Sequence, residues 1–173
     1  ILKPKPVRGG DSGLIRYSWF DGYFDNLTQK VHFFKSSILA ERGLGRYFKE
    51  AMLEMDKAIQ ANPENTDVWI NKINLFNSYI QANYHGKHPA LWAEIIKSCD
   101  KVLSIDKDHL IAWSWKAWST AELKRWEDEL ECENNVLRLD DRQEIQINTL
   151  LAKSFCLYKL GRLVESKKCL LEV

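Results

Sequence analysis

Apolar side chains follow a helical period through residues 106–140, the stretch that the rest of the chain repeats. Between residues 111 and 123 they recur at steps of three to four residues, as on one face of an amphipathic α-helix: Ile111, Ala112, Trp115, Trp118, Ala121 and Leu123. A second run with the same period covers residues 126–137. Lys124 and Arg125 alone separate the two runs, which leaves room only for a tight connection. The stretch therefore predicts a helical hairpin.

The hairpin pattern recurs along the chain. Residues 90–106 align without a gap with residues 124–140, so that Trp92 matches Trp126 and Cys99 matches Glu133 at an offset of 34 residues. Further copies begin near residues 48 and 145. A period near 34 residues with helix-turn-helix content is typical of tetratricopeptide (TPR) repeats. We therefore expect an all-α protein, a right-handed α-α superhelix of antiparallel helical hairpins.

The domain organisation follows from breaks in this pattern. Residues 1–13 contain prolines and glycines and are expected to be an extended or flexible lead-in to a helical-repeat domain at 14–173. The expected hairpins cover about 14–43, 47–82, 90–122 and 126–159, and residues 162–173 begin the last packing helix. A loop insertion is expected around residues 83–89, where one repeat is longer than the next. Since the chain does not begin with Met, we also expect it to be part of a longer protein.

Composition narrows the classes of partner. With 45% hydrophobic and 28% charged residues and a net charge of +1, the chain gives no electrostatic reason to expect nucleic acid or an anionic membrane as its partner. No apolar run reaches the length of a membrane span. Four cysteines, Cys99, Cys132, Cys156 and Cys169, fall inside predicted helices without C-x-x-C spacing, which favours buried thiols over zinc or disulfides. These features predict a cytoplasmic protein, with the nucleus as the alternative.

No catalytic or cofactor motif is legible in the chain. It contains no Gly-rich phosphate loop, no H-E-x-x-H and no G-x-S-x-G. His85 and His88 form an H-x-x-H pair, but no further ligand lies at a suitable spacing, so a metal site is not expected. The acidic cluster at 127–133 favours a solvated helix face over a carboxylate site. We expect no cofactor, no metal and no catalytic residue, and leave open whether the chain is a subunit of an enzyme.

The repeats of this chain resemble those of one known protein family. The Ala112-Trp113 helix, the following Trp126-x-x-Glu129-Leu130 helix and the turn at 140–142 resemble the repeats of protein prenyltransferase α subunits, and residues 58–69 carry a similar pattern. The resemblance covers about residues 48–142. It implies a crescent of helical hairpins that would pair with a β-type subunit holding zinc and isoprenoid. Lys72 and Lys116 stand where that family has Arg, and its Lys-Asn-Tyr and Asn-Tyr-His active-site motifs are not matched here.

The function expected from these patterns is recognition. A solenoid of hairpins places the first helix of each pair on its inner surface, which suits an extended peptide or a partner helix. We therefore predict a helical-repeat scaffold that binds a protein or peptide on a concave surface, through Asn71, Lys72, Trp115 and Lys116, without catalysis of its own. The alternative for each residue is a core or merely solvated side chain. The alternative function is the α subunit, or an α-like subunit, of a heterodimeric protein prenyltransferase.

Overall fold

The structure, a computed structural model, describes residues 27–41, 44–83 and 88–172. This part of the chain contains eight helices and no strand: α1 (Leu27–Glu41), α2 (Leu44–Ala61), α3 (Thr66–Ala82), α4 (Pro89–Ile105), α5 (Leu110–Glu122), α6 (Trp126–Leu139), α7 (Gln143–Lys159) and α8 (Leu163–Leu171). The expected lead-in at 1–13 lies outside the described residues, as does His85 of the H-x-x-H pair.

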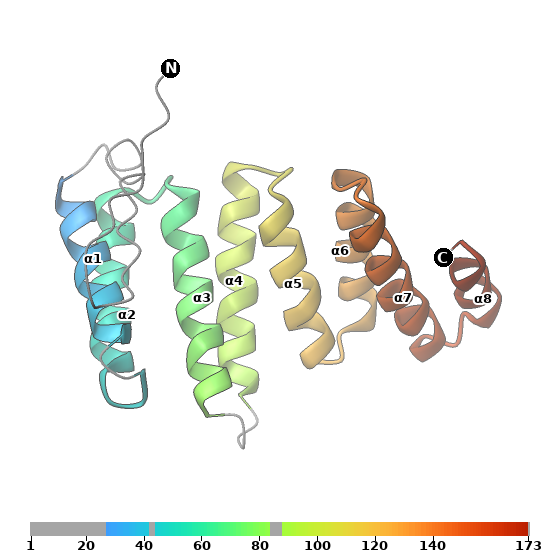
Figure 1. Ribbon diagram of the computed structural model, residues 1–173, viewed down its shortest axis with the longest axis horizontal. Coiled ribbons are helices and arrows are strands. Elements are labelled where there is room, and N and C mark those ends of the chain that lie inside the picture. The colour runs from blue at the N-terminus through green and yellow to red at the C-terminus, as the bar shows by residue number, and fades with distance from the viewer. Residues whose placement is uncertain (1–26, 42–43, 84–87, 173) are drawn as a thin grey trace, which may run out of the picture.

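The helices form a row in which each one packs against the next along the chain. Figure 1 shows this row running from α1 to α8, with successive helices antiparallel. Beyond these neighbours, α3 also touches α5. The predicted all-α class, an α-α superhelix of helical hairpins, is confirmed. Since contacts are local, the buried surface is a series of seams between neighbouring helices rather than one central core.

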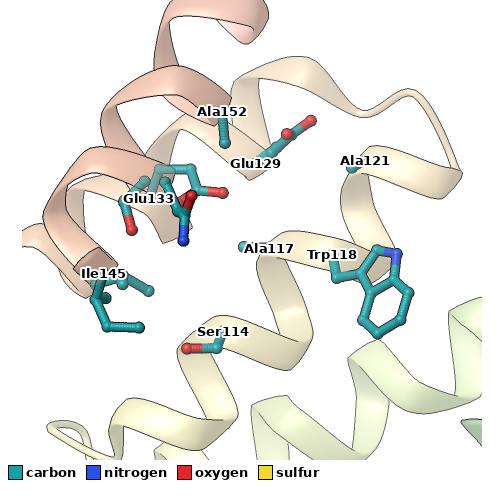
Figure 2. Close-up of a pocket in the computed structure, with 11 residues that line it drawn as sticks. Ser114, Ala117, Trp118, Ala121, Glu129, Glu133, Ile145 and Ala152 are labelled. Atoms are coloured by element: carbon teal, nitrogen blue, oxygen red, sulfur yellow. The ribbon is translucent and has the colours of Figure 1, made fainter. Parts of the chain in front are cut away.

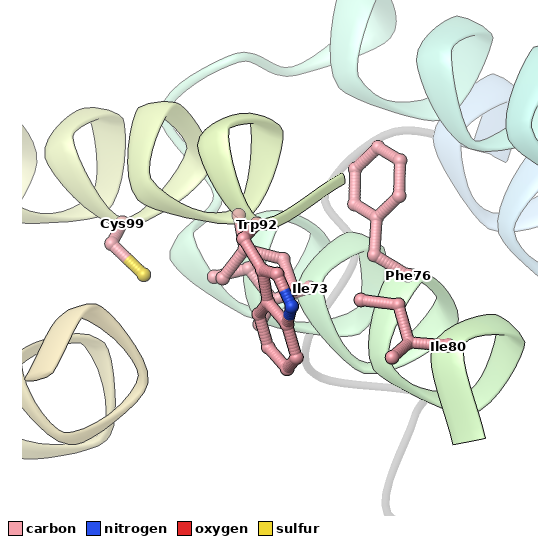
Figure 3. Packing of buried hydrophobic residues seen from close by; sticks show 6 residues of the cluster. Ile73, Phe76, Ile80, Trp92 and Cys99 are labelled. Carbon is pink, nitrogen blue, oxygen red and sulfur yellow. The ribbon is translucent and has the colours of Figure 1, made fainter. Parts of the chain in front are cut away.

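One apolar seam lies between α3, α4 and α5. Ile73, Phe76 and Ile80 on α3 pack against Trp92, Ile95 and Cys99 on α4, and Ile73, Ile95 and Cys99 are fully buried. Figure 3 shows the Trp92 indole lying against Ile73 in this cluster. Trp115 and Leu123 of α5 cover it from the next hairpin. The apolar stripes read from the sequence are therefore the faces that meet here.

The loop insertion expected at residues 83–89 falls mainly on residues 84–87, which lie outside the described residues, and two long helices flank it. Helices α3 and α4 contain 17 residues each, whereas α5 and α6 contain 13 and 14. The extra turns are stabilised because they bury apolar surface: Ile80 joins the α3/α4 cluster, and Tyr79 stacks on Phe48 of α2 with ring centroids 4.0 Å apart.

Two helix ends share one turn geometry. After α5, the Lys124 N–H donates to the Ala121 carbonyl and the Arg125 N–H to the Thr120 carbonyl. After α7, Gly161 and Arg162 donate to Tyr158 and Leu157 in the same pattern. This pattern is the Schellman motif, which needs a left-handed residue after the helix. Lys124 has φ 57° and Gly161 has φ 75°. Lys124 is therefore a non-glycine residue at a position that suits glycine.

Replacing Lys124 with Gly should stabilise the protein. A side chain at positive φ costs about 1 kcal/mol relative to glycine, part of which returns as entropy in the unfolded chain, so we expect a gain of about 0.5–1 kcal/mol. Urea denaturation of the Lys124→Gly variant measures it. The matched control is Gly161→Ala, which should lose about the same amount at the equivalent turn. A loss of stability in Lys124→Gly would contradict the assignment.

The four cysteines are buried thiols, as predicted from their place in helices. Cys99, Cys132, Cys156 and Cys169 are all free and buried. Burial raises the pKa of Cys99 and of Cys132 to about 12, so both remain protonated at neutral pH. Among the described residues, no helix is long and apolar enough to cross a membrane.

Candidate functional site

The two lysines predicted to contact a partner occupy equivalent places in successive hairpins. Lys72 Nζ on α3 lies 2.7 Å from Asp56 Oδ1 on α2, and Lys116 Nζ on α5 lies 2.7 Å from Asp100 Oδ1 on α4. Both lysine side chains are mostly buried, at 14% and 21% exposed. Each lysine therefore joins two neighbouring helices through an ion pair that the sequence did not reveal.

The tryptophans that precede these lysines repeat the same arrangement. Lys72 Nζ lies 5.6 Å from the centre of the Trp69 ring, and Lys116 Nζ lies 5.4 Å from that of Trp113. The Trp69 indole N–H donates to the Pro63 carbonyl at 2.8 Å, and the Trp113 indole donates to that of Lys107 at 2.9 Å. Each tryptophan thus ties its helix to the preceding turn and offers its ring to the lysine.

The ion pair also fixes the charge of Lys116. Burial opposes that charge, but the hydrogen bond to Asp100 and the attraction between the two groups outweigh burial, and the pKa of Lys116 is raised above its ordinary value. The ammonium group is therefore charged at all physiological pH values, with Asp100 as its partner.

Asn71 lies in a shallow recess between α1 and α3. This α1/α3 recess has a volume of about 210 Å³ and a polar lining of serine and asparagine, with Met55 of α2 also part of its lining: Ser36, Ser37, Asn71, Asn74 and Ser78. The Asn71 side-chain amide donates to the Asp67 carbonyl at 2.7 Å. Asn71 is the predicted site residue that lines this recess.

Trp115 is partly buried. It packs against the α3/α4 cluster, and its ring stacks on that of Trp118 at 5.3 Å with 9° between the planes. Trp118 is the more accessible of the two, at 44% exposed. The four predicted residues therefore do not form one site: Asn71 lines a recess, Lys72 and Lys116 bridge separate pairs of helices, and Trp115 supports Trp118.

A second recess lies between α5 and α7, over α6. This α5/α7 recess has a volume of about 370 Å³. Figure 2 shows Ser114, Ala117, Trp118 and Ala121 of α5 on one side, with Ile145 and Ala152 of α7 opposite. Glu129 and Glu133 of α6 line the same space. Small side chains on both walls leave the space open.

The two glutamates correct the interpretation of the acidic cluster as a solvated face. Glu127 and Glu131 are exposed, as expected, but Glu129 is 4% exposed and Glu133 is 9% exposed. They share the buried side of α6 with Cys132 and Val136. That spacing of three and four residues was visible in the sequence, and it continues the apolar stripe of α6 through both glutamates.

Burial leaves these carboxyl groups poorly compensated. Burial, reinforced by the nearby Glu129, raises the pKa of Glu133 to about 8. Burial also raises the pKa of Glu129, although the Cys156 thiol donates a hydrogen bond that opposes the rise. Glu129 Oε2 is buried and has no hydrogen-bond partner among the described residues. Such an atom carries a desolvation cost that a ligand could relieve.

Comparison with known proteins identifies the fold. No family model and no curated protein matches the chain. Among solved structures, the first TPR of Spaghetti (RPAP3) bound to the HSP90 peptide SRMEEVD is similar, with a TM-score of 0.55 at 16% sequence identity over 87% of this chain and 98% of that one. The chain has a TPR-like fold. MamA 41-end from Desulfovibrio magneticus RS-1 superposes more loosely, with a TM-score of 0.40 at 11% identity over 87% of this chain and 94% of that one. The resemblance to prenyltransferase α-subunit repeats is not shown by these comparisons and stays a prediction.

Proposed function

We propose that this chain is a helical-repeat scaffold that binds a protein or peptide partner on a concave surface, without catalytic activity of its own. The surface is formed by α1, α3, α5 and α7 and is called here the odd-helix face. The observation that carries the proposal is the pair of recesses: each opens between two consecutive odd-numbered helices, over the even-numbered helix between them. An extended chain lying across the odd helices would meet both.

The fold supports this proposal. The TPR of Spaghetti has a similar fold and is bound to an HSP90 peptide, so a stack of this shape accommodates an extended peptide. The recesses of the present chain offer apolar and polar groups side by side, including the Trp118 ring at one and the Asn71 amide at the other. Such mixed, partly preformed surfaces favour peptide recognition. Buried thiols suit a reducing compartment, so we place its action in the cytoplasm or nucleus.

The proposed contact residues are Asn71, Lys72, Trp115 and Lys116. In this proposal Asn71 offers its amide oxygen inside the α1/α3 recess, and Trp115 acts by supporting Trp118. Lys72 and Lys116 present their residual exposed charge beside the odd helices while remaining paired to aspartates. Because each lysine also holds two helices together, a simple charge reversal would test folding and binding at once. A charge swap separates the two.

We expect the double variants Asp56→Lys/Lys72→Asp and Asp100→Lys/Lys116→Asp to fold but to bind partner peptides about tenfold more weakly. Each swap keeps an ion pair between the same two helices and inverts the charge on the odd one. Peptides selected on the wild-type protein from a random display library supply the ligands, and calorimetry measures binding.

The matched control is Lys97→Glu on α4, a position 71% exposed on an even-numbered helix. It should leave peptide affinity within about twofold of wild type. Unchanged affinity in both folded swap variants removes the lysines from the contact surface. A loss of binding in Lys97→Glu that exceeds the loss in the swaps places the partner on the even helices and contradicts the proposal.

The prenyltransferase resemblance supplies the second candidate function. The Trp69 and Trp113 units, which carry that resemblance, adopt the same geometry in successive hairpins, as a family repeat would require. In that case the chain would be the α-type partner of a β-type subunit. Copurification with an α-α barrel protein, and transfer of an isoprenoid by the pair to a peptide with a C-terminal Cys, would favour it over the scaffold.

A further inference from the structure

Two buried positions of α6 carry carboxyl groups where the equivalent positions of α4 do not. The gapless alignment of residues 90–106 with 124–140 places Ile95 and Cys99 of α4 at the positions of Glu129 and Glu133. Both α4 residues are fully buried in the α3/α4 cluster. The chain therefore holds two carboxyl groups in a place where the preceding hairpin packs apolar side chains.

Placing two carboxyl groups at these buried positions lowers the stability of the fold unless a counter-charge or a hydrogen-bond donor compensates them. Burying a carboxyl group without a counter-charge is unfavourable, and replacing it with an apolar side chain would remove the cost. The groups that face the two glutamates do not compensate them. From α5 these are Ser114, Ala117, Trp118 and Ala121, and from α7 they are uncharged residues together with the Cys156 thiol. No basic side chain lines the α5/α7 recess among the described residues.

The recess has the features of a receptor for an organic cation. Glu129 Oε2 is buried without a partner, so it can accept a hydrogen bond from a donor that enters. Ala117, Ala121 and Ala152 leave room for an alkyl stem, in a volume of about 370 Å³. Trp118 lines one side of the recess, and its ring packs on Trp115 and Trp92 while remaining 44% exposed. An exposed indole face attracts a cation.

We propose that the α5/α7 recess binds the cationic end of a lysine or arginine side chain that the partner inserts from the odd-helix face. The identity of the ligand as part of a protein or peptide rests on the proposed function, whereas the cation preference rests on Glu129, Glu133 and Trp118. Glu133 supplies the negative charge that pairs with the cation, Glu129 supplies the unpartnered acceptor oxygen, and Trp118 covers the alkyl stem.

Binding should depend on pH in a defined direction. The pKa of Glu133 is about 8, so near neutral pH most molecules hold it protonated and uncharged. A bound cation favours the carboxylate, and each binding event therefore releases a proton below this pKa. We expect affinity to increase by up to about tenfold per pH unit between about pH 6 and 8 and to level off above that range. The Glu129 carboxyl, whose pKa is also raised, and the protonated Cys156 thiol are the other titratable groups at the recess.

The direct test uses small probes on the full chain. n-Butylammonium and n-butylguanidinium stand for the ends of lysine and arginine, and n-butanol is the uncharged control. The readouts are the carboxyl carbon resonance of Glu133 and the fluorescence of Trp118. We expect both cations to shift these signals and to lower the pKa of Glu133, and n-butanol to do neither. The difference between the two cations shows which side chain fits better.

Glutamine variants test which carboxyl group binds the cation. Glu129→Gln and Glu133→Gln keep the size of the side chain and should weaken cation binding at least about tenfold, and Glu133→Gln should also abolish the pH dependence. Glu131→Gln, on the exposed side of the same helix, should bind as wild type does. Equal binding of n-butanol and n-butylammonium, or unchanged cation binding in both recess variants, would overturn the proposal.

A peptide experiment separates this proposal from the proposed function. In selected peptides, replacing a lysine or arginine with norleucine should weaken binding to wild type about tenfold but leave binding to Glu133→Gln nearly unchanged. If the charge-swap variants weaken peptide binding while no basic residue matters, the scaffold function stands and the cation site is wrong. If cations bind the recess while the charge-swap variants bind peptides as wild type does, the cation site stands and the proposed contact surface is wrong.

Discussion

Replacing Glu133 with Gln should stabilise the folded protein above neutral pH and have little effect in acid. Burial raises the pKa of Glu133 from 4.5 to about 8, so the folded state holds a proton that the unfolded state loses above about pH 4.5. Stability that is fully present below pH 4.5 is therefore lost as the pH rises through about 8. The glutamine variant lacks this loss. We expect it to gain about 1–3 kcal/mol at about pH 9, less than the full shift implies, because local relaxation relieves part of the burial.

Chemical denaturation of both proteins at about pH 4 and about pH 9 measures this gain. At the acidic pH the variants should agree within about 0.5 kcal/mol, since Glu133 is protonated in both folded and unfolded states. Glu131→Gln controls for the removal of a charge from α6, because its side chain is exposed. A stability difference that is the same at both pH values would show that Glu133 is not titrating between them.

Replacing Trp92 with Ala should destabilise the protein by about 3–5 kcal/mol. Trp92 is 7% exposed and contributes its indole to the seam between α3 and α4, which Figure 3 shows from close by. Its removal would leave a cavity in the α3/α4 cluster beside Ile73. Thermal unfolding followed by circular dichroism at the helical wavelength measures the loss.

Trp118→Ala is the matched control, since it removes the same side chain from a position 44% exposed. It should cost less, about 2 kcal/mol, because a smaller part of this side chain is buried in the folded protein. Equal losses in the two variants would contradict the burial of Trp92 in the α3/α4 seam. The Trp118 variant also serves the cation experiment, in which it should weaken binding of n-butylammonium without changing the pKa of free Glu133.

The fold could be predicted because the sequence pattern of each hairpin is local and recurs along the chain. Helical hairpins are indicated by three features: apolar side chains at helical spacing, the offset of 34 residues, and the short turn at Lys124 and Arg125. The burial of the four cysteines could be predicted from their positions within helices. What the sequence could not show is the packing near the end of α3, where Tyr79 stacks on Phe48 of α2 and Ile80 joins the α3/α4 cluster.

The candidate site was less predictable for two physical reasons. The ion pairs of Lys72 and Lys116 join residues 16 positions apart on different helices, so their partners depend on how the hairpins close. The burial of Glu129 and Glu133 was not predicted, because carboxyl groups are usually solvated and a solvated helix face was expected. Both residues nevertheless occupy the apolar stripe of α6. At these two positions the charge of the side chain favours an exposed place, whereas the helical period puts both residues on the buried side of α6. The structure follows the period, and the two buried carboxyl groups line the α5/α7 recess.

The neighbour-to-neighbour packing of the helices has a mechanical consequence. In the described part of the stack, the helices contact mainly their immediate neighbours along the chain, with a small further contact between α3 and α5. A small rotation at each seam therefore adds to the next, and the distance between the α1/α3 and α5/α7 recesses can lengthen or shorten with little local strain. If a partner binds both recesses as proposed, their separation should adjust to the length of the partner segment between them.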